Sequence, residues 1–212
     1  MVTLYVEGGG DSKQMRITCR AGFSAFLEKA GLKGHMPRIS ACGGRQNAFE
    51  SYCTAIEHGD SAVLLVDSEA PVLGQYQVGD EKETWQPWQH LKQRQGDGWD
   101  KPVNSVDTDC HLMVQCMESW FLADRATLTT FFGQGFHENS LPAAGNAIES
   151  VSKQQVYQSL ANATKACKTK APYGKGEHSF KLLALITPTT VTAASPWAGR
   201  FVKLLKAKLG VA

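Results

Sequence analysis

The run Ala-Val-Leu-Leu-Val at residues 62–66 constrains the fold of this 212-residue chain more than any other segment. It is wholly apolar, as is typical of a central parallel strand that is covered on both faces. Two short segments rich in β-formers precede it, at 2–6 and 38–42, and each is followed by glycines and then by a helical pattern, at about 12–31 and 45–58. The order β-α-β-α-β predicts an α/β fold with a parallel-rich sheet flanked by helices.

The rest of the chain is predicted to complete this core and then to become helical. Residues 68–110 are irregular apart from a short helix near 84–94, and 111–117 reads as a fourth strand that runs directly into a helix from Glu118. Three further helices are expected, at about 152–168, 177–187 and 196–209. We therefore expect an α/β core over residues 1–132 and a helical C-terminal extension over 133–212 that packs on it.

The composition excludes several classes of protein. With 22 basic and 20 acidic residues, 42% hydrophobic and 20% charged, the chain is neither disordered nor collagenous. Nucleic-acid binding would need a local basic face, because the net charge is only +2. The six cysteines form no C-x-x-C pair, which disfavours structural zinc. The apolar runs are too short to cross a bilayer, so a cytoplasmic protein without membrane contact is expected.

Acidic residues follow three of the predicted strands. Glu7 follows the first strand, Asp67 and Glu69 follow the third, and Glu118 follows the fourth. Ligands of open α/β sheets bind beyond the carboxyl ends of the strands, and carboxylates that converge there repel one another unless a proton or a cation intervenes. Oxygen ligands suit Mg²⁺ or Mn²⁺, which serve phosphoryl-transfer chemistry. Alternatively, Glu7 caps a glycine-rich turn and the others are solvated loop acids.

Two segments together resemble a known family. Residues 4–8 (Leu-Tyr-Val-Glu-Gly) and 64–69 (Leu-Leu-Val-Asp-Ser-Glu) resemble the TOPRIM pattern, in which a Glu after the first strand pairs with Asp-x-Asp after the third. TOPRIM domains occur in topoisomerases, bacterial primases and nucleases of the overcoming-lysogenisation-defect type. Residues 117–124 (Met-Glu-Ser-Trp-Phe-Leu-Ala-Asp) resemble a TOPRIM-like family of unknown function found among bacterial defence genes. Here the second motif ends in Glu69 instead of Asp, and no Lys follows the Glu-Gly pair.

The resemblance implies a divalent-metal-dependent nuclease in bacterial antiphage defence, acting on DNA or RNA, either alone or with a partner ATPase. Glu7 would be a metal ligand or general base, Asp67 and Glu69 would be metal ligands, and Glu118 would be a further ligand or orient a water. Mg²⁺ or Mn²⁺ would be the cofactor. Asp107 and Asp109, just before the fourth predicted strand, are weaker candidates and read better as polar turn residues.

Several other residues are candidates for contacts with phosphate. Backbone amides of Gly8, Gly9 and Gly10, at a helix start, allow close approach of a phosphate, although a tight turn explains the glycines equally well. Arg45 opens the second helix and either holds a phosphate or caps that helix. By resemblance, the loop at 173–178 brings Lys175 and His178 to the scissile phosphate, where they would stabilise charge.

The last predicted helix has a basic face. Lys203 and Lys206 lie opposite its apolar residues and either track a nucleic-acid backbone or simply face solvent. The tryptophans at 85, 88 and 99 could stack on bases, but a core position is favoured for most of them. Two rivals to the nuclease remain open: a non-catalytic TOPRIM-like module that binds a partner ATPase or nucleic acid, and a phosphotransferase or nucleotidyl enzyme that uses the same acidic residues.

Overall fold

The computed structural model describes residues 1–211 and contains a four-stranded, all-parallel sheet. Its strand order is β2-β1-β3-β4, with β1 at Thr3–Val6, β2 at Arg38–Ala41, β3 at Ala62–Asp67 and β4 at Cys110–Met113. All six residues of β3 are buried, because this strand pairs on both sides and is covered on both faces. The prediction of an α/β fold with a parallel sheet flanked by helices is confirmed.

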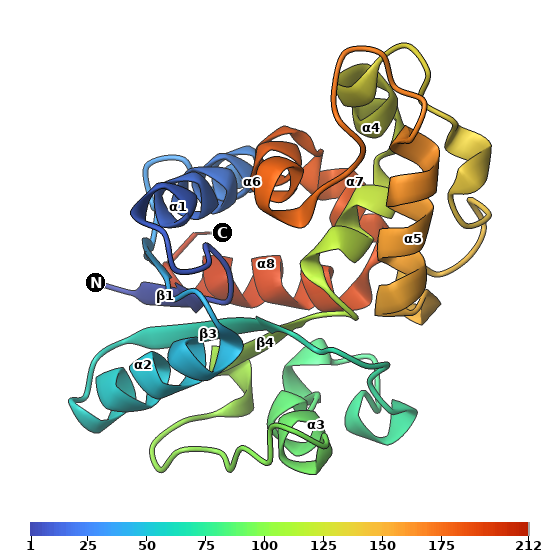
Figure 1. Cartoon of the computed structure of the whole chain (residues 1–212). Helices are drawn as coiled ribbons and strands as arrows, with labels where there is room; N and C mark the ends of the chain where they lie inside the picture. Colours follow the sequence, from blue (N-terminus) through green and yellow to red (C-terminus); the bar gives the residue numbers. More distant parts are fainter. Residues whose placement is uncertain (212) are drawn as a thin grey trace.

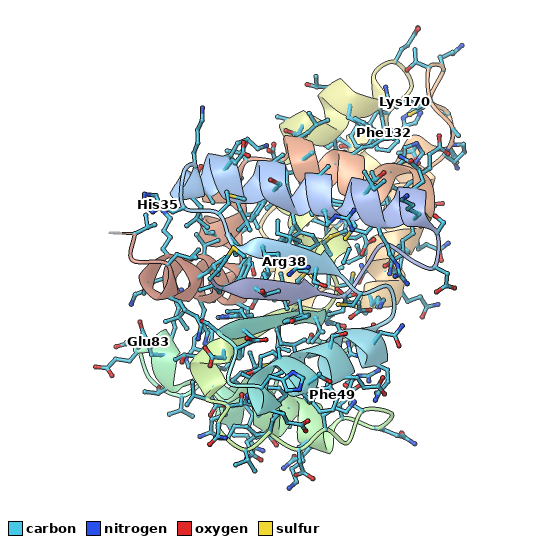
Figure 2. The ribbon with its side chains drawn as sticks, turned by 90° about the vertical axis from the view of Figure 1, so that its left-hand side faces the viewer. His35, Arg38, Phe49, Glu83, Phe132 and Lys170 are labelled. Atoms are coloured by element: carbon cyan, nitrogen blue, oxygen red, sulfur yellow. The ribbon has the colours of Figure 1, made fainter. Side chains whose placement is uncertain are left out.

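Helices cover both faces of the sheet (Figure 1). Figure 1 shows α1, α6 and α8 above the sheet and α2 and α3 below it, while α4, α5 and α7 lie on the upper side toward the right. The view of Figure 2 separates the two sides, with Phe132 above the sheet and Phe49 below it. The helices are α1 (Lys13–Leu27), α2 (Arg45–Glu57), α3 (Pro87–Gln93), α4 (Arg125–Phe132), α5 (Lys153–Thr164), α6 (Lys175–Leu185), α7 (Pro188–Ala194) and α8 (Pro196–Lys208).

Helix starts follow local capping chemistry. Ser12 caps α1 by accepting a hydrogen bond from Met15 N (3.1 Å), and Ser152 caps α5 through Gln155 N (3.2 Å). Ser195 does the same for α8, whose first residue is Pro196. Each of these starts depends on residues only three positions apart, so the sequence alone indicates them.

The predicted segment boundaries fail around the fourth strand. Strand β4 ends at Met113, and Met117–Ala123 forms a 3₁₀ segment where the sequence predicted an α-helix from Glu118. The α-helix that follows, α4, starts only after Asp124, whose carboxylate accepts from Thr127 N and also from Thr187 N, 63 residues away. Asp124 is thus a local helix cap whose other oxygen binds a distant backbone N–H, and only that second contact is absent from the local pattern.

One apolar cluster joins the two parts that the sequence suggested. It contains Leu4, Phe23 and Val63 from residues 1–132, and Leu160 and Phe201 from residues 133–212. A second cluster on the other face of the sheet buries the tryptophans at 85, 88 and 99, in agreement with their expected core role. No helix among the described residues is long and apolar enough to cross a membrane.

Candidate metal centre

Three of the predicted carboxylates meet at the carboxyl edge of the sheet. Glu7 directly follows β1, Asp67 ends the neighbouring strand β3, and one oxygen from each of Glu7, Asp67 and Glu69 lies within 4.8 Å of the others. The backbone helps to bring them together. Asp67 N donates to Glu7 Oε2 (3.0 Å), and Glu69 adopts a left-handed conformation (φ 64°) while its N–H donates to Gln115 O (2.8 Å). Neighbouring strands thus create the cluster predicted from the sequence.

Two cations neutralise part of this cluster. Lys153 Nζ lies 2.5 Å from Glu69 Oε1 and 3.3 Å from Asp67 Oδ2. Arg45 Nη1 lies 3.3 Å from Glu7 Oε2 and donates to the carbonyl oxygen of Asp67 at 2.5 Å. Burial opposes the charged form of Lys153, but the carboxylates outweigh burial and raise the pKa of its ammonium group. Lys153 was not among the predicted site residues, because no residue pattern near it indicates a lysine that points inward.

Arg45 is held rigidly from its other side. Asp97 accepts from its Nε (3.0 Å) and Nη2 (2.6 Å), and the guanidinium lies 4.9 Å from the centre of the Trp99 ring. This bidentate pairing fixes the plane of the guanidinium. Arg45 was predicted either to hold a phosphate or to cap the second helix, and in this structure it pairs with Glu7 and Asp97. Asp97 lies in an irregular segment that gave no sequence signal.

Even with these two cations nearby, burial and mutual repulsion favour the protonated forms of Asp67 and Glu7. Burial, and then repulsion from Glu7 and Glu118, raise the pKa of Asp67 to about 8. Burial also raises the pKa of Glu7, despite the opposing effect of Arg45. Carboxylates in this state gain from a further cation, which would offset the repulsion.

Glu118 lies apart from the three converging carboxylates and is held by hydroxyl groups. Its carboxylate is fully buried and accepts hydrogen bonds from Tyr157 Oη (2.9 Å), Ser179 Oγ (2.9 Å) and Tyr173 Oη (3.3 Å). Among the described residues it lies outside the group within 4.8 Å, although it lines the same crevice. Its three hydroxyl donors tie Glu118 to the C-terminal segments, and its role as a further metal ligand or water-orienting group stays a prediction.

A crevice of about 470 Å³ opens beside the carboxylates. Two glycine turns shape one wall, since Gly8 N donates to Gly43 O (2.9 Å) and Gly43 N donates to Gly8 O (2.8 Å). Gly43 has φ +81°, and a Cβ there would lie 2.8 Å from the carbonyl oxygen of Gly10, so this position requires glycine. The lining residues are Glu7, Gly8, Gly9, Gly10, Asp11, Met15, Gly43, Gly44, Asp67, Met117, Glu118, Lys175, Gly176 and Phe180.

Comparison with known proteins gives a family without a function. The model of a domain of unknown function, DUF4276, matches residues 6–206. The chain belongs to the DUF4276 family. No curated protein and no solved structure matches it. Because the match spans both the α/β core and the C-terminal helices, the crevice lies wholly within the DUF4276 domain.

Lys175 and His178 of the DUF4276 domain, predicted to act together, lie in different surroundings. Lys175 is the first residue of α6 and lines the crevice, with Nζ 5.6 Å from the centre of the Tyr157 ring. His178 is buried, its Nδ1 accepts from Gly174 N (3.0 Å), and its ring packs on Phe132. His178 is not among the described residues that line the crevice, which contradicts its predicted catalytic position. Residues three positions apart usually share a helix face, but here the Lys175 side chain extends toward Tyr157 while the His178 ring packs on Phe132.

The basic residues of α8 lie at the other end of the sheet. Arg200 donates to the carbonyl oxygen of Cys110 (2.8 Å), the first residue of β4, and Lys208 pairs with Asp109 (2.5 Å) just before it. On the same helix, Lys203 pairs with Glu83 (2.5 Å). Lys206 Nζ lies near Gly31, beyond the end of α1. The amino ends of the strands are opposite the carboxylates, so Lys203 and Lys206 do not border the crevice.

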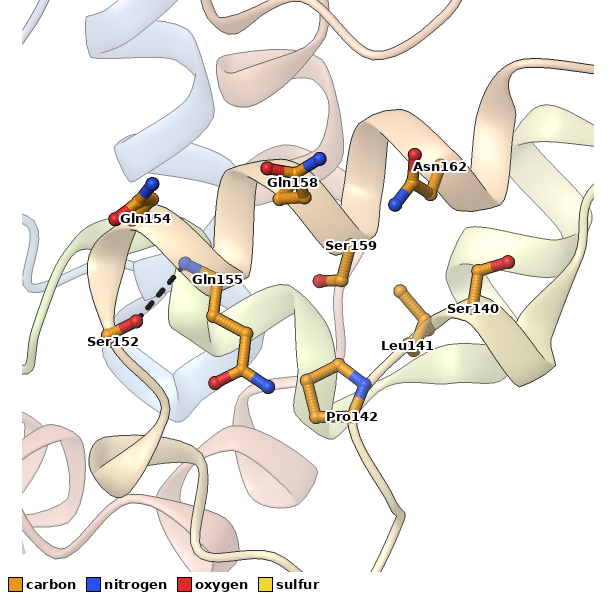
Figure 3. A pocket seen from close by; sticks show the side chains of 9 residues that line it. All are labelled: Ser140, Leu141, Pro142, Ser152, Gln154, Gln155, Gln158, Ser159 and Asn162. Atoms are coloured by element: carbon orange, nitrogen blue, oxygen red, sulfur yellow. Dashed lines mark hydrogen bonds between the residues drawn. The ribbon is translucent and has the colours of Figure 1, made fainter.

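A second cavity of the DUF4276 domain, of about 400 Å³, runs along α5 (Figure 3). Figure 3 shows Gln155 and Ser159 of α5 on the side of the helix toward Leu141 and Pro142. Its lining side chains are neutral, so this cavity offers hydrogen bonds but no acid, base or metal ligand suited to phosphoryl chemistry. They are Ser140, Leu141, Pro142, Ser152, Gln154, Gln155, Gln158, Ser159 and Asn162.

Proposed function

We propose that this protein is a divalent-metal-dependent nuclease that hydrolyses phosphodiester bonds of DNA or RNA, with Mg²⁺ or Mn²⁺ held by Glu7, Asp67 and Glu69. The observation that carries the proposal is the convergence of these three carboxylates within 4.8 Å at the ends of adjacent parallel strands, where Glu7 and Asp67 line an open crevice. The likeness of the sequence to the TOPRIM pattern supports it. A role in antiphage defence and a cytoplasmic setting are part of the same proposal and depend on that likeness and on the composition.

The donor set fits such an ion. All three groups are carboxylates, and Mg²⁺ and Mn²⁺ prefer oxygen ligands of this kind. Burial, followed by repulsion between the carboxylates, raises the pKa values of Asp67 and Glu7, and a bound cation would offset both effects. When bound, the ion would polarise the phosphate and activate a water.

The chain itself supplies the other functions that hydrolysis needs. The backbone at Gly8, Gly9 and Gly10 lines the crevice at the start of α1, where N–H groups and the helix dipole favour a phosphate. Lys175 lines the same crevice and can stabilise negative charge that develops on the phosphate. Glu7, whose pKa lies above its ordinary value, is placed to accept a proton from water.

A cleavage assay tests the proposal. The full chain is incubated with single-stranded DNA, duplex DNA and tRNA, in Mg²⁺, Mn²⁺ or EDTA, beside an Asp67→Asn variant prepared identically. We expect cleavage of at least one substrate in Mg²⁺ or Mn²⁺, none in EDTA, and none with the variant. Activity that persists in EDTA or in the variant would reject this metal centre.

A second function is favoured by one observation, the pairing of Lys153 and Arg45 with the carboxylates. If Lys153 and Arg45 stay paired with the carboxylates and no metal displaces them, the domain serves as a non-catalytic module that binds nucleic acid or a partner ATPase. Binding of nucleic acid by wild-type protein and Asp67→Asn protein alike, without metal-dependent cleavage by either, would favour this second function.

A further inference from the structure

The ammonium group of Lys153 occupies a cation position inside the carboxylate cluster. Its Nζ lies 2.5 Å from Glu69 Oε1 and 3.3 Å from Asp67 Oδ2, and its side chain is only 24% exposed. Glu69 has a second cationic neighbour, Arg45, at 4.0 Å. Among the ion pairs of the described residues, Lys153 is thus the cation closest to both Asp67 and Glu69.

The backbone that carries Lys153 is fixed, whereas its side chain is able to leave. Lys153 is the first residue of α5, directly after the capping residue Ser152, and its N–H donates to Gln115 Oε1 (3.4 Å). Four methylene groups separate this anchored backbone from the ammonium group. By contrast, Asp97 binds Arg45 through two nitrogens, so Arg45 is the less exchangeable of the two cations.

We propose that Lys153 is an internal counter-ion that competes with the divalent ion for Asp67 and Glu69 and thereby sets the metal affinity of the site. This inference rests on the proposed function, because it assumes that those carboxylates are metal ligands. A divalent ion that coordinates the two oxygens must displace the ammonium group from them. The observed metal affinity is then the intrinsic affinity of the carboxylates reduced by the strength of the Lys153 ion pairs.

Direct titration of Mn²⁺ tests the competition without any need for catalysis. Free Mn²⁺ is measured by electron paramagnetic resonance at fixed pH and ionic strength, with wild-type protein, Lys153→Met and Lys165→Met. Methionine keeps much of the length of lysine without its charge. Lys165 is the matched control, because it is an exposed lysine at the opposite end of the same helix and its loss changes the net charge equally.

We expect Lys153→Met to bind Mn²⁺ at least about tenfold more tightly than wild-type protein, because two ionic contacts near 3 Å no longer oppose the metal. Lys165→Met should stay within about twofold of wild type, and Lys153→Arg, which keeps the charge, should stay close to it. Circular dichroism spectra of each variant establish that it is folded. If Lys153→Met unfolds, Lys153→Arg still tests the proposal. A large gain in the Mn²⁺ affinity of Lys153→Arg would contradict the competition, because arginine keeps the positive charge.

The outcomes separate this inference from the proposed function. Equal or weaker Mn²⁺ binding by Lys153→Met, with clear binding by wild type, overturns the competition and leaves the metal centre intact. If Lys153→Met binds Mn²⁺ and wild-type protein does not, the competition is supported, and Lys153 prevents metal binding in the native protein. If neither protein binds Mn²⁺ at millimolar concentration, the proposed metal centre fails and this inference fails with it.

Discussion

Glu7 occupies a position where one carboxylate serves both the fold and the proposed chemistry. Its Oε2 accepts from Asp67 N and from Arg45 Nη1, so it joins the end of β1 to the end of β3 and to the start of α2. Because this oxygen already has two donors, Oε1 is the one left for a metal or a water among the contacts of the described residues.

Glu7→Gln keeps the shape of the side chain and removes its charge. We expect metal-dependent cleavage to fall by about 10²-fold or more, the range for loss of an acid–base group. Nucleic-acid binding should persist, because one negative charge leaves a site that faces phosphates. Initial cleavage rates and a fluorescence-anisotropy titration measure the two effects. Glu57→Gln, at an exposed position on α2, is the control, and equal losses in both variants would contradict the assignment of Glu7.

The titration of Asp67 predicts a pH dependence. The pKa of Asp67 in the folded protein is about 8, above its ordinary value of 3.8. At pH values between these two, the folded state therefore holds a proton that the unfolded state has lost. The metal-free protein should therefore become less stable as the pH rises toward 8. Mg²⁺ binds the charged form, so its stabilising effect should grow over the same interval. Melting temperatures from pH 6 to 9, in EDTA and in Mg²⁺, measure both trends.

The same melting curves for Asp67→Asn supply the control for this pH effect. An amide does not titrate, so both the loss of stability with pH and the gain from Mg²⁺ should shrink. A Mg²⁺ effect that is the same at pH 6 and pH 9 in wild-type protein would show that Asp67 does not limit metal binding.

At the scale of elements, the turn between β2 and α2 distinguishes two adjacent glycines. Gly43 has φ +81° and would place a Cβ 2.8 Å from the carbonyl oxygen of Gly10, whereas a Cβ at Gly44 meets nothing within 4 Å. We expect Gly43→Ala to cost about 2–4 kcal/mol of unfolding free energy through backbone strain and overpacking. Gly44→Ala should cost less than about 1 kcal/mol, as an N-cap change. Urea unfolding compares them, and equal costs would contradict the steric explanation of this turn.

Helix α8 presents its lysines far from the carboxylates. Because Lys203 and Lys206 lie toward the amino ends of the strands, we expect the double variant Lys203→Ala, Lys206→Ala to cleave a short oligonucleotide at the wild-type rate. If a long substrate wraps around the domain, its binding should weaken and become less dependent on salt. Cleavage rates and salt titrations with oligonucleotides of about 8 and 60 nucleotides test this, and a loss on the short substrate would contradict the position inferred for α8.

At the scale of the whole molecule, the division into a core and an extension does not give two separate hydrophobic interiors. The main apolar cluster contains residues from both parts, and Glu118 takes its hydroxyl partners from residues 157–179. A chain that ends at Phe132 would expose one face of the sheet and leave this buried carboxylate without its donors.

We therefore expect residues 1–132 alone to lack cooperative unfolding, whereas the full chain should unfold in a single transition. Thermal melts followed by circular dichroism and a proton–nitrogen correlation spectrum distinguish the two. A dispersed spectrum and a sharp melt for residues 1–132 would establish an independent core and contradict the shared interior.

The sequence by itself determined the class of the fold and the end of the sheet where the acidic residues gather. The apolar run at 62–66 and the glycines after each early strand are local signals, and parallel strands necessarily bring their carboxyl ends to one edge. The common edge of the sheet at which Glu7, Asp67 and Glu69 gather is therefore predictable, whereas the adjacency of β1 and β3 and the backbone contacts of Glu69 are not. Capping serines were predictable for the same reason, since each acts within one helical turn.

Only the tertiary structure decided which partners these carboxylates have. Lys153 reaches Asp67 across 86 residues of sequence, and Asp97 fixes Arg45 across 52. The same packing surrounds Glu118 with hydroxyl groups and buries His178 away from the crevice. Such contacts depend on how α5, α6 and the segment after α3 pack against the end of the sheet, and no residue period or local motif encodes that packing. The charge balance of the site, and with it the affinity for a metal, is thus a property of the folded chain.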